Sequence, residues 1–381
     1  MTPAAPVAEG FVSLDYGGRC LDGVLPAAAG ALGLQLPGAG AAQARFGIPS
    51  AERVCVVLVD GMGYQMLVER AGHAPFLRER LAAGQVLTVG YPSTTAASLG
   101  LFGTGCAAGR TGLAGYTVRN PATGRLANLV SWEGAGPPRQ WQREPPLLGL
   151  IADQGVAVTS VGPARFAGSG LTEATLSGGE YLSAERLADR VDATLGRLAG
   201  PGLVYLYWGQ ADKVGHHLGW QSPQWADALT EIDQELGRLA RSLPPGCLML
   251  ITADHGMVDI DPGQLVDVAA VPALAADVEL VAGEPRATHV YTGAPQEVAA
   301  RWREVLGSAA MVSLGSEAID AGWFGPVSSA VRPLIGDVVV TARGRAGVVD
   351  SRTQTPHSLE LIGMHGSLTP GEMLVPLLVL G

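Results

Sequence analysis

The feature that most constrains the fold of this chain is an unbroken apolar segment at residues 247–251, followed closely by Asp254, His255 and Gly256. A short apolar segment of this kind predicts a strand covered on both faces, as in the middle of a parallel sheet. Functional side chains gather at the carboxyl ends of such strands. Gly256 permits a sharp turn that brings Asp254 and His255 toward one ion, although Asp-His-Gly is also ordinary turn sequence.

Two further apolar segments have the same form. Residues 54–59 precede Asp60-Gly61, and residues 203–208 lead into the segment 209–217. Alternation of such strands with helical patterns predicts an α/β fold, with a doubly wound, mostly parallel central sheet and helices on both faces. We expect helices from residue 64, from near residue 95, and at 25–34, 74–83, 146–154, 183–198, 223–242 and 295–306. Further strands are expected at 85–89, 156–161, 287–291, 337–342 and 373–380.

The domain organisation follows from where this alternation is regular. A chain of 381 residues is long enough for one large α/β domain with an insertion. Residues 1–50, rich in Ala, Gly and Pro, are expected to be a lead-in that packs on the core. Residues 51–257 and 346–381 form the expected catalytic core, and residues 258–345, with shorter elements, an inserted α+β cap subdomain.

Composition narrows the class of protein. Hydrophobic residues make up 47% of the chain, the formal net charge is -10, and Lys213 is the only lysine. An acidic chain of this kind is not expected to bind nucleic acid duplexes or a membrane surface. The N-terminus has no secretory signal pattern, and the four cysteines have no CxxC spacing, so we expect a cytoplasmic protein with reduced thiols.

The candidate metal ligands are carboxylates and imidazoles at four strand ends or turns. If residues 212–216 are helical, the first and last side chains of that segment lie on one face. Mixed oxygen and nitrogen ligands favour Zn²⁺, with Mn²⁺ or Fe as alternatives, over Mg²⁺ or Ca²⁺. Two divalent ions about 4 Å apart would use all six candidate ligands of this chain. They would clamp the attacking and leaving oxygens of a phosphoryl group. The six ligands are Asp60, Asp212, His216, Asp254, His255 and His365.

The candidate nucleophile lies in Pro92-Ser93-Thr94-Thr95. A helix is expected to begin near Thr95, and the positive end of its dipole favours an alkoxide and a phosphate oxyanion. We therefore predict Thr95 as the catalytic residue, with Thr94 as the alternative. A helix-capping hydroxyl is the structural explanation that competes with this role.

Together these segments resemble the ordered motifs of the alkaline phosphatase superfamily, and the type I phosphodiesterase/nucleotide pyrophosphatase family in particular. The resemblance runs from about residue 54 to the C-terminus and rests on residues 59–63, 92–95, 212–216, 253–257 and 365–366. It implies an alkaline phosphatase-like fold. It also implies that Asp60, Asp254, His255 and Thr95 hold one zinc ion, and that Asp212, His216 and His365 hold the other. Thr95 would attack phosphorus and form a phosphothreonine intermediate, which water then hydrolyses.

The chain departs from the family pattern at two places. Ala96 stands where the family has an aromatic residue that stacks on a base. The family's asparagine that supports a non-bridging phosphate oxygen has no clear counterpart. Tyr116 and Asn120 are the candidate substrate-binding residues for that role, with backbone amides as the alternative.

The sequence thus predicts a zinc-dependent phosphoric ester hydrolase that cleaves a phosphodiester or pyrophosphate bond in a small phosphate-ester substrate. The alternative is a phosphomonoesterase or phosphotransferase on the same scaffold. Arg110, Arg119 or Arg165 in loops over the site would then supply the extra positive charge. A non-catalytic binding protein is a second alternative, and it would be expected to lack some of the seven candidate site residues.

Overall fold

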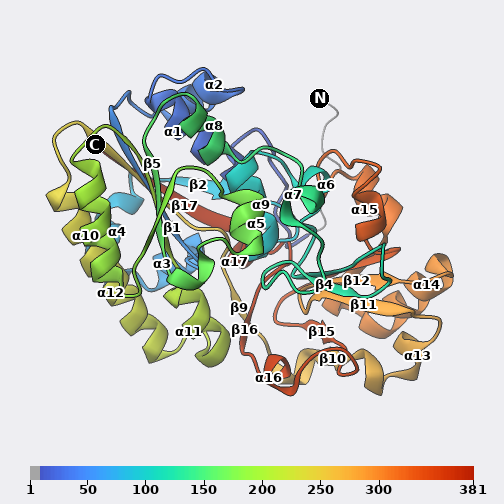
Figure 1. Cartoon of the computed structure of the whole chain (residues 1–381). Coiled ribbons are helices and arrows are strands. Elements are labelled where there is room, and N and C mark those ends of the chain that lie inside the picture. Colours follow the sequence, from blue (N-terminus) through green and yellow to red (C-terminus); the bar gives the residue numbers. More distant parts are fainter. Residues whose placement is uncertain (1–8) are drawn as a thin grey trace.

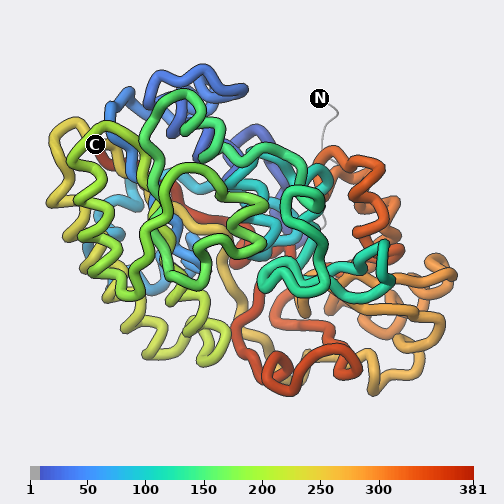
Figure 2. Tube along the Cα trace, viewed as in Figure 1, coloured from blue at the N-terminus to red at the C-terminus, as the bar shows by residue number. Residues whose placement is uncertain are grey.

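The computed structural model describes residues 9–381, and the first eight residues of the expected lead-in lie outside this range (Figures 1 and 2). Its centre is a seven-stranded sheet in the order β2–β17–β8–β1–β7–β5–β6. Strands β8, β1, β7, β5 and β6 run parallel, whereas β17 is antiparallel to both of its neighbours. The predicted α/β fold with a mostly parallel sheet is confirmed. The strands are Gln85–Thr88 (β2), Leu374–Leu380 (β17), Cys247–Thr252 (β8), Arg53–Val59 (β1), Gly202–Trp208 (β7), Val158–Gly162 (β5) and Glu180–Ser183 (β6).

Burial of apolar side chains explains why the inner strands form. Every residue from Val54 to Val59 is fully buried, because helices cover both faces of β1. Helices α4, α10 and α12 pack on one side of the sheet, and α1, α5 and α8 on the other (Figure 1). These helices are Pro75–Leu81 (α4), Leu187–Leu198 (α10), Pro223–Ser242 (α12), Val24–Ala31 (α1), Thr95–Thr104 (α5) and Leu147–Asp153 (α8).

Two differences from the sequence expectation concern the periphery of the core. The helix expected at 183–198 begins at Leu187, because Glu180–Ser183 forms the edge strand β6. A second helix in the lead-in, Ala39–Phe46 (α2), was not expected. Both segments lack a run of large apolar residues, so pairing at a sheet edge and packing against α1 decide their conformation.

A second, antiparallel sheet lies beside the core, in the order β11–β12–β14–β13 (Figure 1). Helix α14 (Pro295–Leu306) packs on it around a hydrophobic cluster that includes Val298 and Trp302. Two small ladders, β10–β15 and β9–β16, tie the start of the expected cap to residues 347–349 and 363–364. The paired elements therefore extend past residue 345. The strands are Leu280–Glu284 (β11), Ala287–Tyr291 (β12), Val338–Ala342 (β14), Ala310–Leu314 (β13), Leu265–Asp267 (β10), Gly347–Val349 (β15), Val258–Asp259 (β9) and Gly363–Met364 (β16).

Two global expectations concern thiols and membrane segments. All four cysteines are free, and three of them are buried. Among residues 9–381, no helix combines the length and the apolar character that a membrane span requires.

A buried ion pair joins the second sheet to the core. Arg286, between β11 and β12, donates to both carboxylate oxygens of Glu372, at 3.0 and 2.7 Å. Both side chains are fully buried. The Glu372 carboxylate also accepts from the Ser367 amide at 3.0 Å. The backbone oxygen of Glu372 accepts from the Gly256 amide at 2.9 Å. The pair thus holds the segments that follow His255 and His365.

We predict that Arg286→Met lowers the free energy of unfolding by about 3–5 kcal/mol, because it leaves a buried carboxylate without its cation. Urea unfolding measures this change. The control is Arg301→Met, since Arg301 and Asp277 form an exposed pair whose loss is expected to cost under about 1 kcal/mol. Equal effects of the two substitutions would contradict the assignment.

His289 on β12 is a packing residue and lies between the two sheets. Its Nε2 donates to the Ala114 oxygen at 2.7 Å, and its Nδ1 accepts from the Gly336 amide at 3.0 Å. Burial lowers the pKa of His289 to about 4, although the bond to Ala114 opposes this shift. The neutral ring is therefore the form that the folded state favours.

A lowered histidine pKa makes stability fall in acid. The contribution is fully present above the unfolded pKa of about 6.5 and is lost as the pH falls toward 4, by up to about 3 kcal/mol. We predict that His289→Gln removes this component, so the free energy of unfolding changes less between pH 7 and pH 4 than in the parent. His73→Gln, at an exposed histidine, should keep the parental pH dependence. Parallel curves of unfolding free energy against pH for the parent and His289→Gln would contradict this prediction.

Candidate metal centre and active site

Three adjacent parallel strands bring the acidic turns together. Strands β8, β1 and β7 are neighbours, so their carboxyl ends meet at one edge of the sheet. Asp60 follows β1, Asp254 and His255 follow β8, and Asp212 lies in α11 (Gln210–Leu218) directly after β7. The Asp212 amide donates to the Asp60 oxygen at 3.1 Å. The turns are thus joined through their backbones.

Gly61 is required at the first of these turns. Its φ is +73°, a conformation that side chains with a Cβ rarely adopt. A Cβ there would also lie 2.8 Å from the Asp212 Cα. The turn after β1 can therefore approach α11 only with glycine at this position.

One group of side chains surrounds His255. Its Nε2 lies 3.1 Å from Thr95 Oγ1, 3.4 Å from Asp60 Oδ1 and 3.6 Å from Asp254 Oδ2. Thr95 is the first residue of α5, so its hydroxyl stands at the positive end of a ten-residue helix. These are the four residues that the family resemblance assigns to one ion.

A second group surrounds Asp212. Its Oδ1 lies 3.2 Å from His216 Nε2 and 3.7 Å from His365 Nε2. Residues 212 and 216 lie in α11, so the condition for their sharing a face is met. Ligand atoms of Asp212, His216 and His365 lie within 4.8 Å of one another, and so do those of Asp60, Asp212 and His255. Asp212 therefore belongs to both groups, where the sequence placed it in one.

The three histidine rings are oriented by backbone carbonyls. Nδ1 of His216, His255 and His365 faces the oxygens of Gly363, Gly256 and Ser93 at 2.7, 3.1 and 2.9 Å. A carbonyl can only accept, so each proton belongs on Nδ1 and each Nε2 lone pair faces the cluster. Two of these lone pairs, on His216 and His365, are 3.3 Å apart. Such an approach is favourable when a metal ion or a proton lies between the two nitrogens.

The donor set fits divalent ions. Asp60 Oδ1, Asp212 Oδ1 and Asp254 Oδ2 are buried, and none has a hydrogen-bond donor among residues 9–381. Buried carboxylate oxygens are normally paired, because an unpaired one loses its hydration without compensation. Cations bound among these oxygens and the imidazole nitrogens would satisfy them all.

The directions of the pKa shifts also indicate that the three carboxylates lack compensating positive charge. Burial, followed by the charges of Asp254 and Asp212, raises the pKa of Asp60 well above its usual range. Burial also raises the pKa of Asp254, against the influence of His255. The pKa of Asp212 is lowered, because His216 and His365 outweigh its burial. The protein alone thus leaves part of the negative charge uncompensated.

A cavity of about 450 Å³ opens from this cluster. Its walls come from the loop around Tyr116, residues 160–181, the end of β7 with helix α11, and the segment around helix α16 (Pro356–Leu359). None of its lining residues belongs to 258–345, so the cap subdomain contributes no side chain to the cavity wall.

The structure separates the two candidate substrate-binding residues. Tyr116 lines the cavity and is 44% exposed, and its amide donates to Glu284 at 2.7 Å. Asn120 does not line the cavity: its amide nitrogen donates to the Gly134 oxygen, and its side-chain oxygen accepts from the Ala122 amide. Asn120 therefore stabilises the turn of the hairpin formed by Thr117–Arg119 (β3) and Leu126–Asn128 (β4), and its side chain is not free to meet a phosphate.

The three candidate arginines also differ. Arg110 pairs with Glu144 and Arg119 with Glu279, whereas Arg165 lines the cavity. Of the residues that the sequence argument missed, Tyr207 is the nearest to the cluster, because its hydroxyl donates to Asp60 Oδ2. Its position near the carboxyl end of β7 was the available signal.

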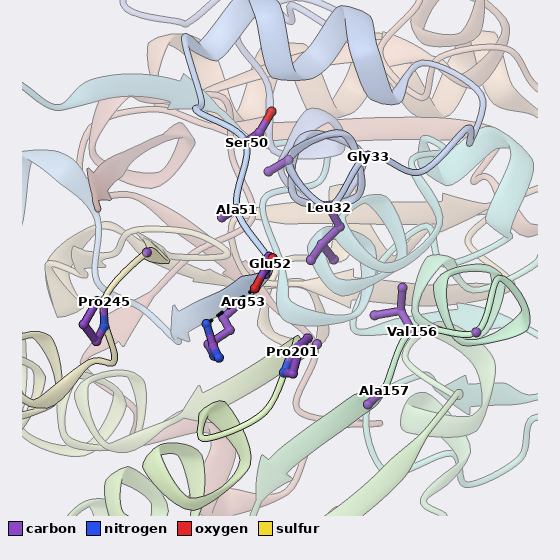
Figure 3. Close-up of a pocket in the computed structure, with 14 residues that line it drawn as sticks. Leu32, Gly33, Ser50, Ala51, Glu52, Arg53, Val156, Ala157, Pro201 and Pro245 are labelled. Atoms are coloured by element: carbon purple, nitrogen blue, oxygen red, sulfur yellow. Dashed lines mark ion pairs between the residues drawn. The ribbon is translucent and has the colours of Figure 1, made fainter.

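A larger cavity, of about 800 Å³, lies at the opposite, amino-terminal edge of the sheet (Figure 3). Its walls are mostly small residues and backbone, with a single ion pair between Glu52 and Arg53 at 3.8 Å. No histidine or cysteine lines it. Size alone therefore does not identify the functional site. The smaller cavity, beside Thr95, is the one lined by candidate catalytic and metal-binding side chains.

The fold and the cluster at the sheet edge define a protein of the alkaline phosphatase superfamily. The family model for type I phosphodiesterase / nucleotide pyrophosphatase matches residues 54–368, and the chain belongs to that family.

Curated relatives match over a short segment. Human ectonucleotide pyrophosphatase/phosphodiesterase family member 5 is 37% identical over 70 residues, which are 17% of this chain and 15% of the relative. Family member 7, also human, is 36% identical over 72 residues, 17% of this chain and 16% of the relative. The chain thus matches less than a fifth of the length of these relatives.

Solved structures match over most of the chain. Murine ectonucleotide pyrophosphatase/phosphodiesterase 5 superimposes with a TM-score of 0.70 at 18% identity, and covers 86% of this chain and 88% of its own. An inactive threonine-to-alanine variant of that murine protein, in complex with AMP, gives a TM-score of 0.68 at 17% identity over the same shares. These likenesses show the alkaline phosphatase-like fold.

We predict opposite effects of Asp254→Asn on the metal-free and the zinc-loaded protein. Without divalent ions, removing one of three close carboxylate charges should leave the melting temperature unchanged or raise it. The increase in melting temperature on adding zinc should be smaller than in the parent, because one ligand oxygen is lost. Thermal unfolding with and without zinc measures both.

Asp233→Asn is the matched control. Both Asp233 oxygens accept from backbone amides, of Phe76 and Leu77, at 3.2 and 2.8 Å. Its loss should therefore lower the melting temperature and leave the zinc-dependent rise intact. A full zinc-dependent rise in Asp254→Asn would exclude Asp254 as a ligand.

Proposed function

We propose that the protein is a two-metal hydrolase that cleaves a phosphodiester or pyrophosphate bond through a phosphothreonine intermediate. The observation that carries the proposal is the position of Thr95 Oγ1, at the first residue of α5 and 3.1 Å from His255 Nε2, at the edge of the acidic cluster. The other support is membership of a phosphodiesterase/nucleotide pyrophosphatase family.

The proposed ion sites use the residues that the family resemblance assigns. Asp60, Asp254 and His255, with Thr95, would hold one ion, and Asp212, His216 and His365 the other. Zinc is the proposed metal because half of the six ligands are imidazoles. Bound ions would lower the pKa of the Thr95 hydroxyl and offset the negative charge of the phosphoryl group.

The chain's own residues then account for the chemistry. Thr95 Oγ1 attacks phosphorus, the bond to the departing ester oxygen breaks, and the phosphoryl group is transferred to Thr95. Water cleaves the Oγ1–P bond in the second half and regenerates the hydroxyl. The N-terminus of α5 stabilises the negative charge on the phosphoryl oxygens in both halves. Tyr207 holds Asp60 through its hydroxyl, so that the other carboxylate oxygen, Oδ1, faces the cluster.

The proposed substrate is a small phosphate ester. A murine relative with this fold was solved with AMP, which suits a nucleotide-like group in the cavity. Ala96 offers no aromatic ring for stacking at the position next to the nucleophile, and it is fully buried. Any ring of the substrate would instead meet the tyrosines of the cavity wall, with Tyr116 as the proposed substrate-binding residue.

A phosphomonoesterase is the second candidate, and the observation that favours it is Arg165 in the cavity wall. Rates on bis(4-nitrophenyl) phosphate and on 4-nitrophenyl phosphate, with zinc-loaded protein, separate the two. We expect preference for the diester. Preference for the monoester would assign the protein to the phosphatases.

We predict that Thr95→Ala lowers kcat by about 10³-fold or more, because the covalent step loses its nucleophile. Thr94→Ser is the matched control, since Thr94 is buried at the cap position and makes no capping bond. It should keep most of the activity. Full activity in Thr95→Ala would move the nucleophile elsewhere.

A further inference from the structure

The charges in the wall of the active-site cavity are unbalanced. Two basic side chains, Lys213 and Arg165, line it. The acids in the same wall are Asp60 and Asp212, and both belong to the proposed metal cluster. Among residues 9–381, the cavity wall apart from the cluster therefore carries basic side chains and no acidic one.

Lys213 is the only lysine of the chain, and it follows the proposed ligand Asp212 directly in α11. It is exposed, and none of the ion pairs or side-chain hydrogen bonds among residues 9–381 involves its ammonium group. His217 lies four residues further along the same helix and stacks against His357 of α16, with ring centroids 5.2 Å apart. Lys213 thus projects from the helix face that forms one side of the cavity mouth.

Arg165 stands in the 3-10 turn Ala164–Phe166, with its guanidinium stacked over the Phe166 ring at 4.9 Å. Glu185, in the turn after β6, accepts from the Ala164 amide at 2.9 Å, and among residues 9–381 it forms no ion pair with Arg165. By contrast, Arg110 and Arg119, which do not line the cavity, are paired with Glu144 and Glu279. Arg165 keeps its charge available to a ligand.

Two unpaired cations at one cavity are unexpected in a chain of net charge -10, where acids outnumber bases by 35 to 25. The cluster does not need them, because bound divalent ions would balance its carboxylates. Cations that line a cleft attract anionic ligands and raise their local concentration. Both side chains are solvent-exposed at the cavity, so their charges are accessible to a bound ligand.

We propose that Lys213 and Arg165 select substrates whose organic group carries a negative charge of its own, in addition to the phosphate that Thr95 attacks. This inference rests on the proposed phosphoric ester hydrolase activity and names the substrate class within it. The cavity wall is rich in aromatic side chains, with Phe166 and Tyr207 edge-to-face at 5.5 Å and with Tyr181 and Tyr205 also in the lining. A ring that ends in an anion fits this surface.

The test uses two symmetric diesters of one shape, bis(4-carboxyphenyl) phosphate and bis(4-carbamoylphenyl) phosphate. They differ only in the charge of the para group, and symmetry places the same group in the cavity whichever ester bond reacts. The measured quantity is the ratio of kcat/KM for the carboxylate to that for the carboxamide. Comparing this ratio between protein variants removes the intrinsic difference between the two leaving groups.

We expect the ratio to fall by about five- to tenfold in Lys213→Gln and again in Arg165→Gln, with carboxamide turnover little changed. Raising the salt concentration should lower the ratio in the parent and have less effect in the double variant. Arg78→Gln is the control, since Arg78 is exposed on α4 and does not line the cavity. Its ratio should equal that of the parent.

A ratio that stays constant across the cavity variants, while both esters are hydrolysed, would overturn the charge selection and leave the proposed activity standing. Binding tests the selection independently of turnover. Calorimetric dissociation constants of the two esters for zinc-loaded Thr95→Ala, with and without Lys213→Gln, should show the same five- to tenfold loss for the carboxylate only. If neither ester is hydrolysed by the parent, the proposed activity on these esters fails, and the dissociation constants alone decide whether the cavity prefers the anion.

Discussion

The structure depends on the parallel alignment of β8, β1 and β7. Because these strands are neighbours and point the same way, three turns that are far apart in sequence reach one edge of the sheet. Each turn brings an aspartate, and close packing of the turns leaves three carboxylate oxygens buried and without donors. Burial of the apolar strands thus offsets the free-energy cost of burying these carboxylates. Bound cations would remove that cost by pairing with the carboxylate oxygens.

A second set of contacts fixes Thr95 relative to His365. Ser93, two residues before Thr95, exchanges backbone and side-chain hydrogen bonds with Gly366 and accepts from His365 Nδ1. The Arg286–Glu372 pair then holds the segment after His365 against the second sheet. The second sheet therefore supports the segment after His365, although residues 258–345 contribute nothing to the cavity wall.

Much of the fold could be predicted because the strongest patterns are local. The apolar runs of β1, β7 and β8 and the periodic helix Pro223–Ser242 lie where the sequence places them. Segments without a strong apolar pattern, such as β6 and α2, were missed, because neighbouring elements decide their conformation. Asn120 illustrates the same limit within the site: a polar residue in a loop gives no sign of whether it meets substrate or closes a turn.

The sequence by itself determined the chemical inventory: the three aspartates, the three histidines and Thr95, each placed by a strand end, a turn or a helix start. Local signals suffice there, because an apolar run followed by an acid and glycine has few possible conformations. Only the tertiary structure decided how these residues are shared, with Asp212 facing both groups and Tyr207 holding Asp60. It also decided that Lys213 and Arg165 enter the cavity with free charges while Arg110 and Arg119 are neutralised, since ion pairing depends on contacts between residues distant in the chain.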